Sequence, residues 1–208
     1  MPIYKSLKVA PVFTLTVMSA CSSDGGSNTT VAEAAEQLVT LGDELSSYDD
    51  LETSDIPTTG SANYQGAALF TDIDGDDALF GQVDISVSFL GNGDVDGSID
   101  DFVYINDIED AADNNPDRLG HNVNGVLTFT NGEIDRTAAT DDVQLWADLS
   151  GNLNAPVDMF GAGTDVAVDT EFGAEFLEGG LVGEAFGTMK PSEGTLVYIG
   201  GIILATEQ

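Results

Sequence analysis

From about residue 60 onward, apolar and polar residues alternate along the chain with a period of two. In the clearest run the apolar residues are Val83, Ile85, Val87 and Phe89, and the polar residues are Asp84, Ser86 and Ser88. Successive side chains of a β-strand point to opposite faces, so this alternation predicts a strand with one buried and one solvated face. Several such segments separated by glycine-rich turns predict an all-β fold, an antiparallel barrel or sandwich.

Two further segments support strands of this kind. In the second alternating run the apolar residues are Val143, Leu145, Ala147, Leu149 and Leu153, with Gln144, Asp148 and Ser150 on the polar face. In the third segment, strand residues are followed by Asn131-Gly132, a dipeptide typical of tight hairpin turns. We expect short strands around a filled interior, as in a soluble barrel. An outer-membrane barrel would need strands of about 9–11 residues with lipid-facing apolar bands, which this pattern does not fit. Residues 106–125 and 154–173 break the alternation and predict long loops, where binding usually resides.

The N-terminus predicts export and lipid attachment. Residues 1–20 combine two lysines, a short apolar run and small residues before Cys21, the layout of a signal peptide. The ending Met18-Ser19-Ala20-Cys21 resembles a bacterial lipobox, and this lone cysteine has no disulfide partner. We therefore expect Cys21 to be the lipidated first residue of a mature outer-membrane lipoprotein, exposed at the cell surface. The alternative is an ordinary signal peptide with an incidental cysteine.

Between the lipid and the strands, the sequence predicts a tether and one helix. Residues 21–30 form a short polar tether. Thr30 and Glu33 fit a capping box, and the leucines at 38, 41 and 45 share one helical face, which predicts a helix over roughly 31–46. Its expected role is structural, either plugging the strand domain or packing against it. The segment "SDIPTTGS" closes a helix-and-linker region over 31–59 and predicts a boundary before a barrel domain over 60–208.

The charge of the chain excludes several classes of partner. The mature protein carries 37 acidic residues against Arg118, Arg136 and Lys190, a net charge of about −34. Such a surface repels nucleic acid and anionic lipid and attracts cations and basic partners. Solvation in salty water is the alternative explanation of the same charge.

The stretch "GNGDVDGSID" (91–100) has the residue types of a calcium loop. Its flanks are strand-like, however, and Val103 stands where an EF-hand has its bidentate acid. We therefore expect a hairpin over 83–105 with its turn within 90–95 and Gly97 at a bulge or close approach. The acids that remain candidate weak calcium ligands are Asp94, Asp96 and Asp100, and, in "DIDGDD", Asp72, Asp74 and Asp76.

Catalytic chemistry is poorly supported by the sequence, which predicts no enzyme. There is one histidine, His121, and no nucleophile-elbow motif. His121 shares the polar 106–125 segment with Arg118, which makes the two residues a candidate haem site; an ordinary exposed loop histidine is the alternative. Trp146 is either an exposed binding anchor or, as is more common, packed beneath a loop or the helix.

Several short segments resemble the β-barrel domain of transferrin-binding protein B. They are "NYQGAAL", "VDISVSFLGNGDVDGSI", "GVLTFTNGEI", "ADLSGNL" and "GAEFLEGGLVGEAFG", in the family's order and over roughly residues 60–208. The resemblance implies an eight-stranded barrel in a surface lipoprotein that captures a host protein, haem or another solute and is not an enzyme. The chain has one barrel and a helix in place of two lobes with handles, and no ligand residue of the family maps onto it.

The sequence therefore predicts a monomeric, outer-membrane-anchored binding module for an unidentified ligand. The alternative function is an acidic structural or cation-binding surface protein without a specific ligand.

Overall fold

The structure is a computed structural model that describes residues 30–72, 77–107, 119–138, 143–191 and 196–208. The expectations for the signal peptide, the tether and Cys21 lie outside these residues. The candidate ligands Asp74, Asp76 and Arg118 lie outside them as well.

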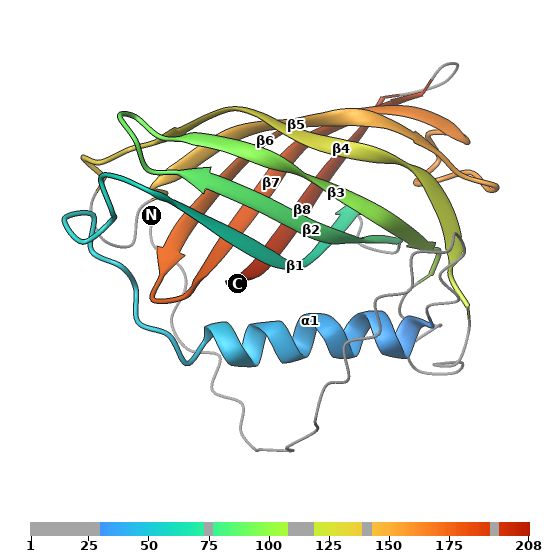
Figure 1. The fold of residues 1–208 in the computed structure, drawn as a ribbon. Helices are drawn as coiled ribbons and strands as arrows, with labels where there is room; N and C mark the ends of the chain where they lie inside the picture. The colour runs from blue at the N-terminus through green and yellow to red at the C-terminus, as the bar shows by residue number, and fades with distance from the viewer. Residues whose placement is uncertain (1–29, 73–76, 108–118, 139–142, 192–195) are drawn as a thin grey trace.

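Eight antiparallel strands form a closed barrel in chain order, with β1 paired to β8 (Figure 1). The predicted all-β barrel preceded by one N-terminal helix is confirmed. The expectation of short strands is wrong, because the strands have 10 to 14 residues. They are β1 (Ser61–Asp72), β2 (Ala78–Ser88), β3 (Asp94–Ile105), β4 (His121–Ile134), β5 (Leu145–Asn154), β6 (Asp165–Leu177), β7 (Gly180–Pro191) and β8 (Val197–Glu207).

Helix α1 (Val31–Leu45) begins at the predicted capping box. The Thr30 hydroxyl accepts a 3.2 Å hydrogen bond from the Glu33 amide, and the Glu33 carboxylate accepts one of 2.8 Å from the Thr30 amide. The hydrogen bonds that the Glu33 carboxylate accepts from the Thr30 amide and hydroxyl stabilise its charged form and lower the pKa of Glu33. No helix in the described part of the chain is long and apolar enough to cross a membrane.

Of the two roles expected for the helix, packing is the observed one: α1 lies along the outside of the barrel (Figure 1). Its first turns cover an apolar cluster on the outer positions of β2 and β3, where Val31 and Ala34 pack with Phe80 and Val103. Its last residue, Leu45, lies against Gly180 at the start of β7. The helix therefore hides apolar side chains that would otherwise face solvent.

Apolar side chains fill the barrel interior. Phenylalanines from four strands are almost fully buried in it, and the rings of Phe129 and Phe172 meet edge to face with centroids 5.2 Å apart. Burying one such side chain contributes about 2–3 kcal/mol relative to exposure. The predicted filled interior is confirmed.

The hairpin predicted over 83–105 is also confirmed. Strands β2 and β3 pair in register around a turn at 89–93, and Val83, Ile85, Val87 and Phe89 all face the interior. A side chain at Gly97 would collide with the Asp84 carbonyl oxygen on the neighbouring strand, as the predicted close approach requires.

The Asn131-Gly132 dipeptide does not form the predicted turn. Strand β4 runs through it, and the pairing with β5 shifts by a bulge between Thr130 and Glu133. Asn131 takes a left-handed backbone (φ 56°) and donates a 2.7 Å hydrogen bond to Asp148 on β5. A side chain at Gly132 would collide with Val95. The left-handed backbone that Asn131 would take in a tight turn is used in a bulge instead.

The linker before β1 folds over one end of the barrel. Ile56 is buried in the barrel core. The Arg136 guanidinium donates hydrogen bonds to the carbonyls of Ile56 (3.3 Å), Pro57 (2.8 Å) and Phe89 (2.9 Å). Helix, linker and barrel are therefore joined by buried contacts and polar bonds.

Gln144 departs from its predicted position on the polar face. It precedes β5 and is 2% exposed. Its side-chain NH₂ donates to the Leu51 carbonyl (2.9 Å), and its carbonyl accepts from the Phe176 amide (3.0 Å). This glutamine joins the linker to β6 at the end of the barrel that the linker covers.

Candidate functional site

The opposite end of the barrel carries the β1–β2, β3–β4, β5–β6 and β7–β8 connections, and the β5–β6 loop covers the interior there. Met159 and Phe160 of that loop are buried. The Phe160 amide donates a 3.1 Å hydrogen bond to the Tyr104 hydroxyl, and the two rings meet edge to face at 5.2 Å. The Tyr104 hydroxyl donates to the Asp77 carboxylate. Burial and this neighbouring acid raise the pKa of Tyr104, so its hydroxyl stays protonated. Described residues thus close both ends of the barrel.

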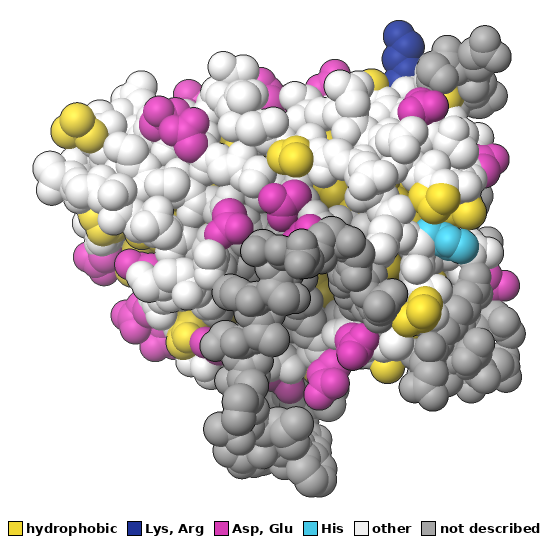
Figure 2. Space-filling model, turned by 45° about the vertical axis from the view of Figure 1, so that its right-hand side comes forward, with side chains coloured by type: hydrophobic (Ala, Val, Ile, Leu, Met, Phe, Trp, Pro, Cys, Tyr) yellow, Lys and Arg dark blue, Asp and Glu magenta, His cyan; other side chains and the backbone are white. Residues whose placement is uncertain are grey.

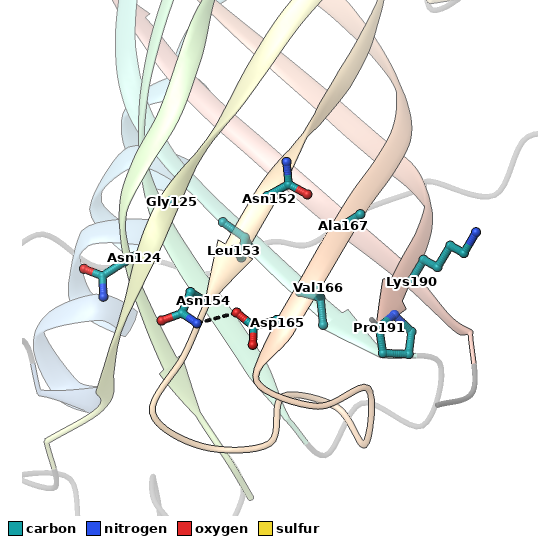
Figure 3. Close-up of a pocket in the computed structure, with 10 residues that line it drawn as sticks. All are labelled: Asn124, Gly125, Asn152, Leu153, Asn154, Asp165, Val166, Ala167, Lys190 and Pro191. Carbon is teal, nitrogen blue, oxygen red and sulfur yellow. Dashed lines mark hydrogen bonds between the residues drawn. The ribbon is translucent and has the colours of Figure 1, made fainter. Parts of the chain in front are cut away.

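An open groove of about 700 Å³ lies on the outside of the barrel at the same end (Figure 3). Strands β4 to β7 line it. Gly125 and Ala167 leave space in it because they have little or no side chain, while Asn152 and Lys190 flank Ala167 in one row across the sheet. Asn154 donates a 2.5 Å hydrogen bond to Asp165 at the rim. These amide and charged groups suit a polar ligand.

A second exposed surface covers the outer positions of β5 to β8, and we call it the aromatic–acidic face. Its large apolar side chains point to solvent with exposed fractions of 44% for Trp146, 62% for Phe186, 65% for Tyr198 and 41% for Ile202. Carboxylates share the same face. The residues of the aromatic–acidic face are Trp146, Asp169, Glu171, Glu184, Phe186, Tyr198 and Ile202.

Two rings of this face lie over glycines. A side-chain carbon at Gly173 would lie 3.2 Å from the Trp146 ring, and one at Gly200 would lie 3.3 Å from the Phe186 ring. Each glycine is the cross-strand partner of its aromatic residue: Gly173 of β6 pairs with Trp146, and Gly200 of β8 pairs with Phe186. The rings therefore rest on bare backbone while much of their surface stays in solvent.

The structure places His121, the two predicted loops and Trp146 differently from the leading expectation for each. His121 is the first residue of β4 and pairs with Tyr104, so the prediction of a loop histidine is wrong. The predicted loops were also too long, because residues 121–125 belong to β4 and 165–173 belong to β6. Trp146 is exposed on the barrel exterior, which contradicts the packed alternative and leaves the anchor interpretation.

The candidate calcium ligands are not gathered into one site. Asp94, Asp96 and Asp100 lie along a single strand, opposite Ser88, Ser86 and Gln82 of β2. Asp72 ends β1 at the other end of the barrel. Burial, together with Asp101 and Asp84, raises the pKa of Asp100. Within the described ranges, no group of three or more His, Cys, Asp or Glu side chains could hold a metal ion.

Sequence reasoning missed Phe186, Tyr198 and Ile202. One feature does point to them: "LVYIGGIILA" (196–205) is apolar at both odd and even positions, so its outer face is apolar too. Alternation alone could not tell which of these outer residues α1 covers. Leu204 lies under the helix near Gly42 and is 9% exposed, whereas Ile202 is left in solvent.

Acidic side chains are spread over the molecular surface seen in Figure 2, and hydrophobic side chains appear there in small separate groups.

Searches against protein-family models, curated proteins and solved structures found no match. The likeness to the transferrin-binding protein B barrel domain therefore stays a prediction, and the exposed surfaces of the barrel are the basis for a functional assignment.

Proposed function

We propose that this protein is a non-enzymatic, lipid-anchored surface protein of the outer membrane that captures a ligand on the outside of a filled barrel. The observation that carries the proposal is the closure of the barrel at both ends. Phe160 and Tyr104 cover one end, and Ile56, held by the Arg136 bonds, covers the other.

A filled interior directs binding to the outer wall. Small-molecule carriers with a barrel fold hold their ligand in an internal cavity, which needs space that apolar side chains occupy here. The groove between β4 and β7 lies on the outer wall instead, at the end that carries four of the seven strand connections. The groove is the first candidate for the binding surface.

The anchor is tested by replacing Cys21 with Ala. We expect the wild-type protein in the detergent-soluble membrane fraction, with a mass increase for the acyl chains, and Cys21→Ala in the soluble fraction. A Cys21→Ala protein that stays in the membrane fraction would refute lipid attachment at this residue.

Capture is tested with immobilised protein and a panel of haem, calcium, oligosaccharides and culture-medium proteins. Ala167→Trp fills the centre of the groove, and Ala32→Trp, on the exposed face of α1, is the matched control. We expect a component that binds the wild type and the control but not Ala167→Trp. Binding that survives Ala167→Trp unchanged would exclude the groove as the capture site.

A second candidate function is an acidic, cation-binding surface protein without a specific ligand, favoured by the spread of carboxylates in Figure 2. Non-specific attraction of cations falls with ionic strength and does not depend on groove shape. If all capture disappears in high salt and Ala167→Trp behaves like Ala32→Trp, this second function is the correct one.

A further inference from the structure

We infer that the aromatic–acidic face is a docking site for a cationic amphipathic peptide segment, one that carries lysine or arginine between apolar side chains. This inference goes beyond the groove, and it holds whether or not Cys21 carries lipid.

The apolar groups of the face form one connected surface. Phe186 on β7 lies opposite Gly200 on β8, and Tyr198 and Ile202 are the neighbours of Gly200 on the same side of that strand. Since adjacent strands are about 4.8 Å apart, the three side chains surround a glycine within contact distance of a single ligand residue. Trp146 extends the surface to β5, in the row that runs through Gly173 and Glu184 to Ile202.

Carboxylates are interleaved with these apolar groups. Glu184 lies directly across from Ile202, and Glu171 lies directly across from Phe186. Asp169 continues the pattern beside Thr188, the cross-strand partner of Tyr198. Each large apolar side chain of β7 and β8 is thus within about two strand spacings of an acid.

The charges select the chemistry of the partner. Among the described residues on outer positions of β5 to β8, Lys190 is the basic one, and it belongs to the groove. A ligand cation over Trp146, Phe186 or Tyr198 gains cation–π attraction and meets a carboxylate beside the ring. A purely apolar partner would leave these carboxylates desolvated, and an acidic partner would be repelled.

A second copy of the chain is a poor occupant of the same face. Each mature chain carries about −34 charges, so two copies meeting here would bring like-charged carboxylates together. Exposed apolar groups rimmed by charge usually mark an interaction site, and charge complementarity assigns this one to a basic segment.

The test uses the full mature chain with Cys21→Ser and a fluorescein-labelled amphipathic peptide made of lysine and leucine. Binding is followed by fluorescence anisotropy and by the emission of Trp146, the only tryptophan of the chain. We expect saturable binding whose affinity falls with salt. The double variant Phe186→Ser/Tyr198→Ser should weaken it by about tenfold or more, as removal of anchoring aromatics does.

Two controls separate this site from general stickiness and from general charge. Val39→Ser/Leu90→Ser removes two side chains that are equally exposed, at 63% and 71%, but lie off the face, and it should bind like the wild type. Glu171→Gln/Glu184→Gln should weaken binding and reduce its salt dependence. Thermal melts confirm that all variants are folded.

Three results would overturn the inference. One is wild-type affinity in Phe186→Ser/Tyr198→Ser, and another is an equal loss in Val39→Ser/Leu90→Ser. The third is a wild-type dimer in sedimentation that Phe186→Ser/Tyr198→Ser abolishes, with no peptide binding, since the face would then be a self-association surface.

Discussion

Replacing Gln144 with Leu tests whether the linker is an integral part of the barrel. Leucine is close to glutamine in size but makes no hydrogen bond. The change leaves the Phe176 amide and the Leu51 carbonyl without the partners that lie 3.0 Å and 2.9 Å away in the wild type. A weaker contact of the Gln144 side chain with the Thr53 hydroxyl, at 3.4 Å, is lost as well.

The magnitude follows from the burial of these groups. A buried donor or acceptor left unsatisfied costs about 1–3 kcal/mol. The Phe176 amide is in the barrel core, whereas Leu51 is half-buried, so water can partly replace its bond. We therefore expect Gln144→Leu to lower the free energy of unfolding by about 2–4 kcal/mol.

Urea unfolding followed by circular dichroism and by Trp146 fluorescence measures this value. Gln65→Leu is the matched control: the Gln65 side chain also donates a hydrogen bond, of 2.7 Å to Asp84, but this bond is exposed to water, so its loss should change stability by about 0.5 kcal/mol or less. A Gln144→Leu protein as stable as the control would contradict this prediction. It would show that the linker contributes little to the free energy of unfolding.

Three further predictions concern the hairpin of β2 and β3. Phe89→Ala should destabilise the protein by about 3–5 kcal/mol in urea unfolding, because this buried ring leaves a cavity; a loss below about 1 kcal/mol would mean that the end of the barrel collapses freely. Burial and the nearby Asp84 raise the pKa of Asp100 in the folded state, so its charged form opposes folding at neutral pH. Asp100→Asn should therefore melt above the wild type at pH 7, with an advantage that shrinks as the pH falls below the raised pKa; a constant or reversed difference would contradict the shift. Asp94→Asn/Asp96→Asn should melt like the wild type without calcium and with it; a large calcium-dependent rise in the wild type alone would establish a metal site there.

Much of the fold follows from local sequence patterns. The alternation around Ile85 fixes the register of the hairpin, because a slip by one residue would bury Asp84 and expose the apolar set. The capping box at Thr30 fixes the start of α1 for a similarly local reason.

The incorrect predictions share a non-local cause. Asn131 is in a bulge and not a turn because Asp148 on another strand binds its side chain. Gln144 is buried because a linker about 90 positions earlier in the chain folds over it. His121 belongs to a strand because it pairs with Tyr104 of β3, although the glycine before it and the asparagines after it suggest a loop.

The candidate site was predictable only in part. Trp146 stood out as a lone tryptophan in an alternating strand, so an exposed anchor was one of two interpretations. The exposure of Phe186 and Ile202 depends on where α1 ends its cover of β7 and β8, which no local pattern specifies. Apolar residues on both faces of a strand show that something covers the outer face, but not which residues are left uncovered.

We propose that binding takes place on the outer wall of a filled barrel. An NMR titration of the isotope-labelled mature chain with the lysine–leucine peptide distinguishes this wall from the interior. We predict shift changes at the indole N–H of Trp146 and at the backbone amides around Phe186 and Ile202, with the core signals of Phe102 and Phe129 unchanged. Shift changes concentrated in the barrel interior, or none on β5 to β8 at saturating peptide, would contradict the claim.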